Sequence, residues 1–316
     1  MDNYLITALI SLLLTLTVRT RNLQQNFVKQ PESLSIVEGG NVTLECRVRD
    51  KVGVLQWTKD DFGLGTSRSL PGYSKIAMVG GNNETWNLEI LNVTLEDDGK
   101  YQCQVGATEV AQPVRSRYAL VRVLSPPQPP VLTAGPELVL RDGKTALVQC
   151  ISKGGKPASA IRWRRNGELI NTGVLEKIEK LNRSSEFITV STLTFPVASN
   201  MTGDSLECEA SHEAEDVART VSTSIVVEFA PIVSLSADTE TIYEGDSVKL
   251  TCSAQANPGL IEYHWTLGGK ELVEGRGARE VVLLVDRNFH LKKVSCYARN
   301  TKGENMASYS LDVKCK

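Results

Sequence analysis

The sequence has few histidines and almost no net charge. It has three histidines, and its formal net charge is only -2. A charge this close to zero gives no overall field that would attract nucleic acid or an anionic membrane. The histidines His212, His264 and His290 are scattered, so their spacing assembles neither a zinc site nor a Cys-His nucleophile. We therefore expect no catalytic residues, no metal and no cofactor.

Long hydrophobic runs are also scarce. Residues 5–18 form one uncharged stretch, which is too short for a membrane helix but fits the core of a signal peptide. No later segment approaches the roughly 20 apolar residues that a membrane helix needs. We interpret residues 1–20 as a signal peptide cleaved near Thr20; the alternative is a buried apolar helix.

Cysteines, in contrast, recur regularly, and a Trp follows the first Cys of each pair. The Trp comes 11 to 13 residues after that Cys, and the second Cys comes 44 to 58 residues after it. This spacing is typical of immunoglobulin sandwiches, in which a disulfide joins strands B and F and a Trp on strand C packs against it. Such pairs also indicate an oxidising, extracellular compartment. The predicted triplets are Cys46, Trp57, Cys103; Cys150, Trp163, Cys208; and Cys252, Trp265, Cys296.

The pattern predicts an all-β chain of three tandem immunoglobulin-like domains, at residues 21–125, 126–229 and 230–316. Residues alternate between apolar and polar around each first Cys, as in strands. Proline-rich links at Ser125–Pro130 and Ala230–Pro231 favour an extended rod. The run ending at Cys103 also predicts a tyrosine corner at Tyr101.

One cysteine, Cys315, has no partner in these pairs. It could pair with a cysteine in a further domain, or it could link two chains. The third alternative is that it is an artefact of a truncated end.

The first domain carries most of the candidate glycosylation sites. Three of the five N-x-S/T sequons lie there, and alternation places Asn41 and Asn92 on the sheet that holds strands A, B and E. The opposite sheet, with strands C, F and G, has no sequon, which marks it as a candidate protein-binding face. The alternative is that the sequons are scattered without meaning. The predicted sites are Asn41, Asn83, Asn92, Asn182 and Asn200.

Uncharged polar side chains are predicted to lie on that sequon-free face. If Trp57 and Cys103 point inward, their neighbours Gln56, Thr58, Gln102 and Gln104 point outward, and Gln offers both a donor and an acceptor. The following turn is expected to expose apolar side chains beside glycines, a combination that suits contact; alternatively, Phe62 folds back on its own sheet. The predicted binding residues are Gln56, Thr58, Asp60, Asp61, Phe62, Gly63, Leu64, Gln102 and Gln104.

Several segments of this chain resemble the Kirre/roughest (kin of IRRE-like, nephrin-related) family of immunoglobulin adhesion proteins, particularly its invertebrate members. The resemblance is strongest in the first domain and covers nearly the whole chain after residue 20. The segments are QWTKDDFGLGTSRSLPG at 56–72, MVG at 78–80, NLEI at 87–90, DDGKYQCQV at 97–105, GGKPA at 154–158 and ANP at 256–258.

The resemblance implies a cell-surface recognition protein that binds in trans through the C-C′-F-G face of its first domain. The implied partner is the protein itself or a nephrin-type relative, and Gln56 matches the family's central interface Gln. Family members carry five immunoglobulin domains, a membrane helix and a cytoplasmic tail, so a fragment would come from a single-pass membrane protein. If the chain is complete, a secreted binding module, such as a decoy or immune recognition protein, is the alternative.

Overall fold

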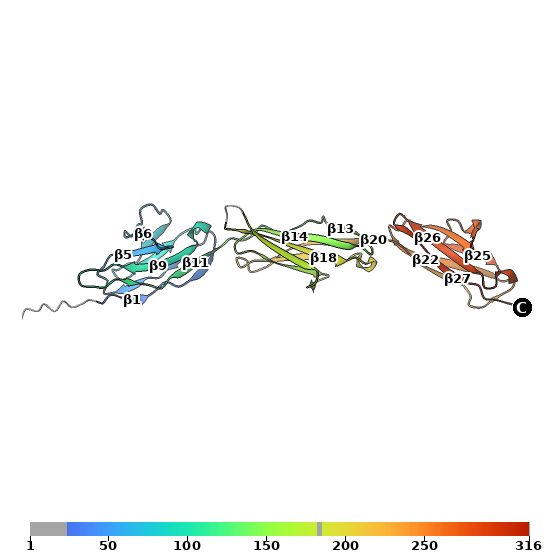
Figure 1. The fold of residues 1–316 in the computed structure, drawn as a ribbon, viewed down its shortest axis with the longest axis horizontal. Helices are drawn as coiled ribbons and strands as arrows, with labels where there is room; N and C mark the ends of the chain where they lie inside the picture. The colour runs from blue at the N-terminus through green and yellow to red at the C-terminus, as the bar shows by residue number, and fades with distance from the viewer. Residues whose placement is uncertain (1–23, 182–184, 316) are drawn as a thin grey trace, which may run out of the picture.

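A computed structural model describes residues 24–181 and 185–315 of the chain. The predicted signal peptide and the sequon at Asn182 lie outside the described residues. The described residues form three β-sandwiches in a row, and their strands run along the length of that row (Figure 1). The prediction of an all-β chain with three tandem immunoglobulin-like domains in an extended rod is confirmed.

The first sandwich packs one sheet of strand order β2-β11-β9-β5-β6, with β10 beside β9, against a sheet of order β3-β8-β7. A short pair, β1 and β4, lies at its start. The elements are β1 Asn26–Lys29, β2 Leu34–Val37, β3 Val42–Leu44, β4 Arg47–Arg49, β5 Leu55–Lys59, β6 Phe62–Gly65, β7 Ile76–Val79, β8 Asn87–Ile90, 3-10 helix η1 Leu95–Asp97, β9 Gly99–Val105, β10 Val114–Arg115 and β11 Ala119–Leu124.

The second sandwich faces a sheet of order β12-β14-β18-β17 against one that holds β16, β15, β19 and the start of β20, with β13 also beside β20. Its elements are β12 Val131–Leu132, β13 Glu137–Arg141, β14 Thr145–Gly155, β15 Ala160–Arg165, β16 Glu168–Ile170, β17 Val174–Lys180, β18 Phe187–Pro196, 3-10 helix η2 Ser199–Met201, β19 Ser205–Ser211 and β20 Arg219–Ala237.

The third sandwich combines the end of β20, β22 and β25 with the sheet β24-β23-β26-β27 and the pair β21-β28. Its elements are β21 Ile242–Tyr243, β22 Ser247–Asn257, β23 Glu262–Leu267, β24 Lys270–Leu272, 3-10 helix η3 Val273–Gly275, β25 Glu280–Leu284, 3-10 helix η4 Arg287–Phe289, β26 Lys293–Asn300, β27 Gly303–Ser310 and β28 Val313–Lys314.

Each sandwich has its own core around one disulfide and one Trp. Trp57, Trp163 and Trp265 are fully buried, and each pairs across its sheet with the second Cys of its domain. The Trp57 indole Nε1 donates to the Trp86 carbonyl over 2.8 Å, so its polar atom is satisfied. The disulfides join Cys46 to Cys103, Cys150 to Cys208, and Cys252 to Cys296.

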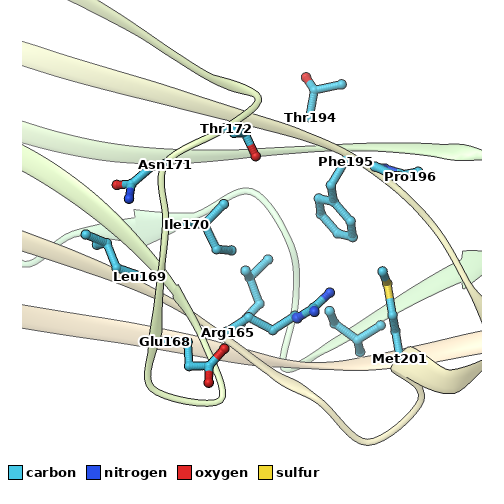
Figure 2. Close-up of a pocket in the computed structure, with 12 residues that line it drawn as sticks. Arg165, Glu168, Leu169, Ile170, Asn171, Thr172, Thr194, Phe195, Pro196 and Met201 are labelled. Carbon is cyan, nitrogen blue, oxygen red and sulfur yellow. The ribbon is translucent and has the colours of Figure 1, made fainter.

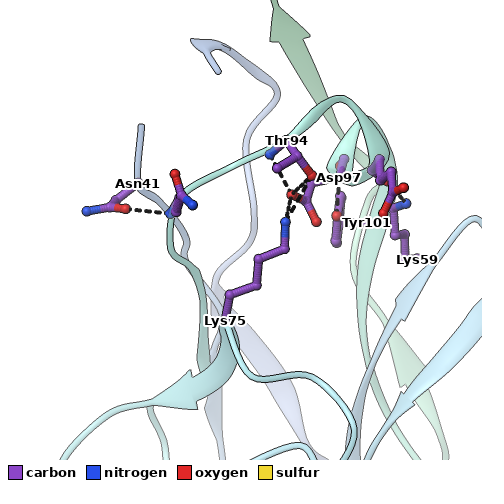
Figure 3. A network of polar contacts seen from close by, with 8 residues as sticks. Asn41, Lys59, Lys75, Thr94, Asp97 and Tyr101 are labelled. Atoms are coloured by element: carbon purple, nitrogen blue, oxygen red, sulfur yellow. Dashed lines mark hydrogen bonds and ion pairs between the residues drawn. The ribbon is translucent and has the colours of Figure 1, made fainter. Parts of the chain in front are cut away.

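Tyr101 closes the corner of the first sandwich. Its hydroxyl donates to the backbone carbonyl of Asp97 over 2.8 Å. The buried Asp97 carboxylate in turn accepts from the backbone N–H of Thr94 over 2.8 Å and forms an ion pair with Lys75 (Figure 3). At the matching positions of the later sandwiches, Leu206 and Val294 are buried instead.

The three sandwiches are joined without long linkers. Between the first two, Ser125 and Lys156 exchange backbone hydrogen bonds of 2.9 Å, and the Lys156 ammonium lies 2.8 Å from the Asp98 carboxylate. Between the second and third, β20 is a single strand that pairs first with β19 and then with β22. Its pairing with β22 is irregular between Phe229 and Ile232, around Pro231, whose nitrogen has no proton to donate.

Candidate functional site: the outer face of the first sandwich

The candidate site is the outward side of the sheet that contains β5, β6, β9 and β11. Antiparallel register opposes Gln56 to Gln104 and Thr58 to Gln102 on this side, while Trp57 and Cys103 point into the core. The alternation predicted for these two strands is therefore present.

Gln56 is an uncharged polar side chain on this face. Its side chain is half-buried and lies over Gly63, where an added Cβ would be 1.9 Å from the Gln56 Nε2 atom. Within the part of the chain that the structure describes, the Gln56 amide forms no side-chain hydrogen bond. Its donors and acceptor are therefore free for a partner.

The neighbouring amides are used within the domain. Gln102 Nε2 donates to the Ser116 carbonyl over 2.6 Å, and Gln104 Nε2 donates to Gln102 Oε1 over 2.8 Å. Thr58 and Gln102 are 4% and 6% exposed, so the expectation that both present free side chains on the surface is wrong. They share the outward side, but both are buried, and Gln102 bonds to the segment that contains Ser116.

The turn between β5 and β6 is held by its two aspartates. Asp60 and Asp61 have φ values of 48° and 70°, as both central residues of a type I′ hairpin require. Asp60 Oδ1 accepts from the Lys100 backbone N–H over 2.9 Å. Asp61 Oδ1 accepts from the Tyr118 hydroxyl over 2.7 Å, and this hydrogen bond raises the pKa of Tyr118. Both carboxylates are exposed, yet they bond within the domain, where they tie the turn to β9 and to the residue that precedes β11.

The turn exposes Phe62, as predicted, but buries Leu64. Leu64 is only 6% exposed and belongs to the core, so its predicted exposure is wrong. The register shifts there, since Trp57 opposes Gly65 while Thr58 opposes Gly63. Leu64 is thus the extra residue of a bulge, and a bulge can redirect a side chain. Phe62 is 80% exposed, but it opposes Lys59 and so lies at the sheet's edge, on the side opposite to Gln56.

Sequence reasoning missed two contributors to this face. Tyr118 and Leu120 are 48% and 41% exposed, and Leu120 opposes Lys100 on the outward side. The alternation of buried Ala119, Val121 and Val123 could have revealed them. Together with Val54, which is 64% exposed, they add apolar area to the side of the sheet that carries Gln56.

The sequons of this domain lie away from that face. Asn41 directly precedes β3 and Asn92 follows β8, both in the opposite sheet, and the Asn92 backbone N–H donates to Asn41 Oδ1 over 2.8 Å. Asn83 lies between β7 and β8, and Asn200 belongs to η2 of the second sandwich. All four are exposed.

Other features carry less chemistry. A pocket of about 480 Å³ in the second sandwich lies between β16 and β18, where Ile170, Phe195 and Met201 meet the charged Arg165 and Glu168 (Figure 2). Residues 24–181 and 185–315 contain no group of three His, Cys, Asp or Glu side chains suited to a metal. The same ranges contain no helix long and apolar enough to cross a membrane.

Cys315 is unpaired and exposed.

Comparison with known proteins identifies two domains by family models. Residues 26–106 match the immunoglobulin domain, and residues 127–218 match the CD80-like C2-set immunoglobulin domain. In the crystal structure of Rst D1-D2, the aligned region is 36% identical, with a TM-score of 0.62, and covers 65% of this chain and 99% of that structure.

Full-length relatives match over most of this chain. The irregular chiasm C-roughest protein of Drosophila melanogaster is 33% identical over 92% of the chain, and kin of IRRE-like protein 3 of Homo sapiens is 34% identical over 91%. The match spans 41% and 36% of these two relatives, respectively. The chain belongs to the Kirre/roughest, or kin of IRRE-like, family of immunoglobulin-superfamily cell-adhesion proteins.

Proposed function

We propose that the chain is the ectodomain part of a cell-cell recognition receptor that binds in trans through the outward face of its first sandwich. The partner is a second copy of the protein or a nephrin-type immunoglobulin protein. Display at the cell surface would come from a region of the receptor beyond these 316 residues.

The free amide of Gln56 carries this proposal. A half-buried amide without an internal partner can bond to a binding partner without breaking a hydrogen bond inside the domain. The apolar area of Val54, Tyr118 and Leu120 on the same side of the sheet can be buried in the same contact. The face carries charges of both signs, since the Lys100 ammonium lies over the Tyr118 ring and Asp61 accepts from the Tyr118 hydroxyl, so no field of a single sign repels an identical copy.

The extended row of sandwiches supports binding between molecules on two opposing cell surfaces. An extended chain holds its first sandwich far from its last one (Figure 1). Single contacts of this kind are expected to be weak and to act in numbers on a membrane.

Bead aggregation tests the proposal. Beads coated with the chain should aggregate with each other or with beads that carry a nephrin-type protein, and Gln56→Ala should weaken this aggregation. Glu89→Ala, a half-buried position on β8 of the opposite sheet that belongs to no sequon, is the matched control and should aggregate like the unchanged chain. Equal aggregation by Gln56→Ala, or no aggregation with either partner, would overturn the assignment.

A further inference from the structure

The second sandwich has an unpaired sheet edge at β17. In the described part of the chain β18 is its sole strand partner, and the two pair without a bulge along all seven residues. Every residue of β17 is exposed; Leu175 is 72% exposed and Ile178 is 50% exposed. Native proteins usually shorten, bulge or charge such an edge, because it can pair with another strand.

Half of the backbone groups of β17 point away from the sheet. Gly173 and Leu181 bond to β18 at the two ends of the ladder, through a Thr194 N–H to Gly173 O bond of 2.8 Å and a Leu181 N–H to Glu186 O bond of 2.9 Å. In an antiparallel ladder these bonded pairs alternate, so the odd-numbered residues of β17 bond to β18. The even-numbered residues direct N–H and C=O to the free edge; they are Val174, Glu176, Ile178 and Lys180.

We propose that this edge pairs with β17 of a second copy of the chain, antiparallel and centred on Ile178. The charge sequence favours this register. Two copies related by a two-fold axis through Ile178 place Lys177 opposite Glu179 twice and Glu176 opposite Lys180 twice. Opposite charges across a ladder stabilise pairing, and like charges destabilise it.

The apolar positions and the backbone agree with the same register. Ile178 meets Ile178 on the two-fold axis, and Leu175 meets Leu181. The even-numbered residues face each other, so the free N–H and C=O groups bond across the axis. Shifting the axis by one residue places Lys177 opposite Lys177 or Glu179 opposite Glu179. The alternating charges therefore discourage pairing with an arbitrary strand while they complement an antiparallel copy of β17.

This pairing fixes the relative direction of the two molecules. The strands run along the row of sandwiches (Figure 1), so an antiparallel contact at β17 sets the two rods side by side and pointing in opposite directions. The edge belongs to the second sandwich and leaves the Gln56 face of the first one free. One seven-residue ladder is small for a stable interface, so the contact is weak.

Exchanging the charges at positions 177 and 179 tests this register. Sedimentation equilibrium of the full chain measures how strongly each variant self-associates. Lys177→Glu places two glutamates opposite each other at both charged pairs around the axis, and Glu179→Lys places two lysines opposite each other there. Each single variant should therefore self-associate about tenfold more weakly than the parent. The double variant and the equimolar mixture of the two single variants both recover opposite-charge pairs. Both should return to within about threefold of the parent affinity.

The design separates this contact from binding by the first sandwich. The substitutions are exposed and in another domain, so any first-domain association is the same in all samples and cancels in the comparison. All proteins carry Asn182→Gln, so that a sugar near this edge in sequence contributes nothing. Equal association by all samples, or a double variant and a mixture as weak as the single variants, would overturn the proposal.

Discussion

The Gln56 side chain occupies the space that Gly63 leaves open: its Nε2 atom is 1.9 Å from where a Cβ at residue 63 would lie. A glycine on β6 thus decides the position of the amide on β5. Gln56, on which the proposed contact depends, therefore needs the space that a glycine at position 63 leaves.

Gly63→Ala should consequently weaken binding without unfolding the domain. The new methyl group collides with the flexible end of Gln56, which can move, and Gly63 does not have a positive φ. We expect a melting temperature within about 2 °C of the parent, an amide displaced from its site, and reduced bead aggregation.

Gly65→Ala is the matched comparison. Gly65 has a φ of +126°, so a side chain there strains the backbone and should cost about 1–2 kcal/mol of stability. Thermal melting of both variants distinguishes the two effects. A Gly63→Ala domain that melts as low as Gly65→Ala, or that binds like the parent, would contradict this role for Gly63.

The tyrosine corner should contribute measurably to the stability of the first sandwich. Tyr101→Phe removes the hydroxyl that satisfies the buried Asp97 carbonyl, and we expect a loss of about 1–3 kcal/mol in the free energy of unfolding. Denaturant titration gives this value. Tyr73→Phe, at a tyrosine that is 40% exposed, serves as control and should leave stability unchanged.

Acid should destabilise the first sandwich through Asp97. Burial raises the pKa of this carboxyl, but hydrogen bonds from Lys75 and Thr94 outweigh it, and the folded-state pKa is lowered. Its stabilising contribution is thus complete above the unfolded value of about 4 and is lost as pH falls through the lower folded value.

Melting temperatures recorded from pH 7 to pH 2 check this sign. Asp97→Asn should reduce the loss of stability below about pH 4. Glu32→Gln, which removes a carboxylate from an exposed pair with Arg117, should leave the acid profile close to that of the parent. An Asp97→Asn profile as steep as the parent's would exclude Asp97 as the group responsible.

Reduction of the disulfides should unfold the sandwiches. The bridges join residues 57, 58 and 44 positions apart, and in the chain-entropy model each contributes about 4 kcal/mol, a large part of the net stability of a small domain. Circular dichroism during a thermal melt with strong reductant should show a much lower transition. A melting curve unchanged by reductant would rule this out.

The sequence predicted the fold better than the site. The Cys-Trp-Cys triplets mark strands B, C and F directly, because the disulfide and the Trp form the centre of each core. Alternation also assigned Gln56 to the outward side correctly. It could not show that Gln102 is covered by the Ser116 segment, since that contact joins β9 to the loop between β10 and β11, and no local pattern describes how this loop packs.

Alternation of apolar and polar residues also failed to predict two features of this sheet. Leu64 enters the core because a bulge adds one residue to β6, which breaks the alternation there. The bond between Tyr118 and Asp61 joins positions 57 residues apart, and neither residue type signals it. Both depend on strand register, which is set by the whole sheet.

A sugar placed on the proposed face tests the central claim most directly. Leu120→Asn with Arg122→Thr creates a sequon on the outward side of β11, and Glu89→Asn with Leu91→Thr creates one on the opposite sheet. Both chains are first checked for an attached sugar and an unchanged melting temperature, and bead aggregation is then measured. We predict that the sugar at position 120 abolishes aggregation and the sugar at position 89 leaves it intact. Aggregation that survives the sugar at position 120 would contradict binding through this face.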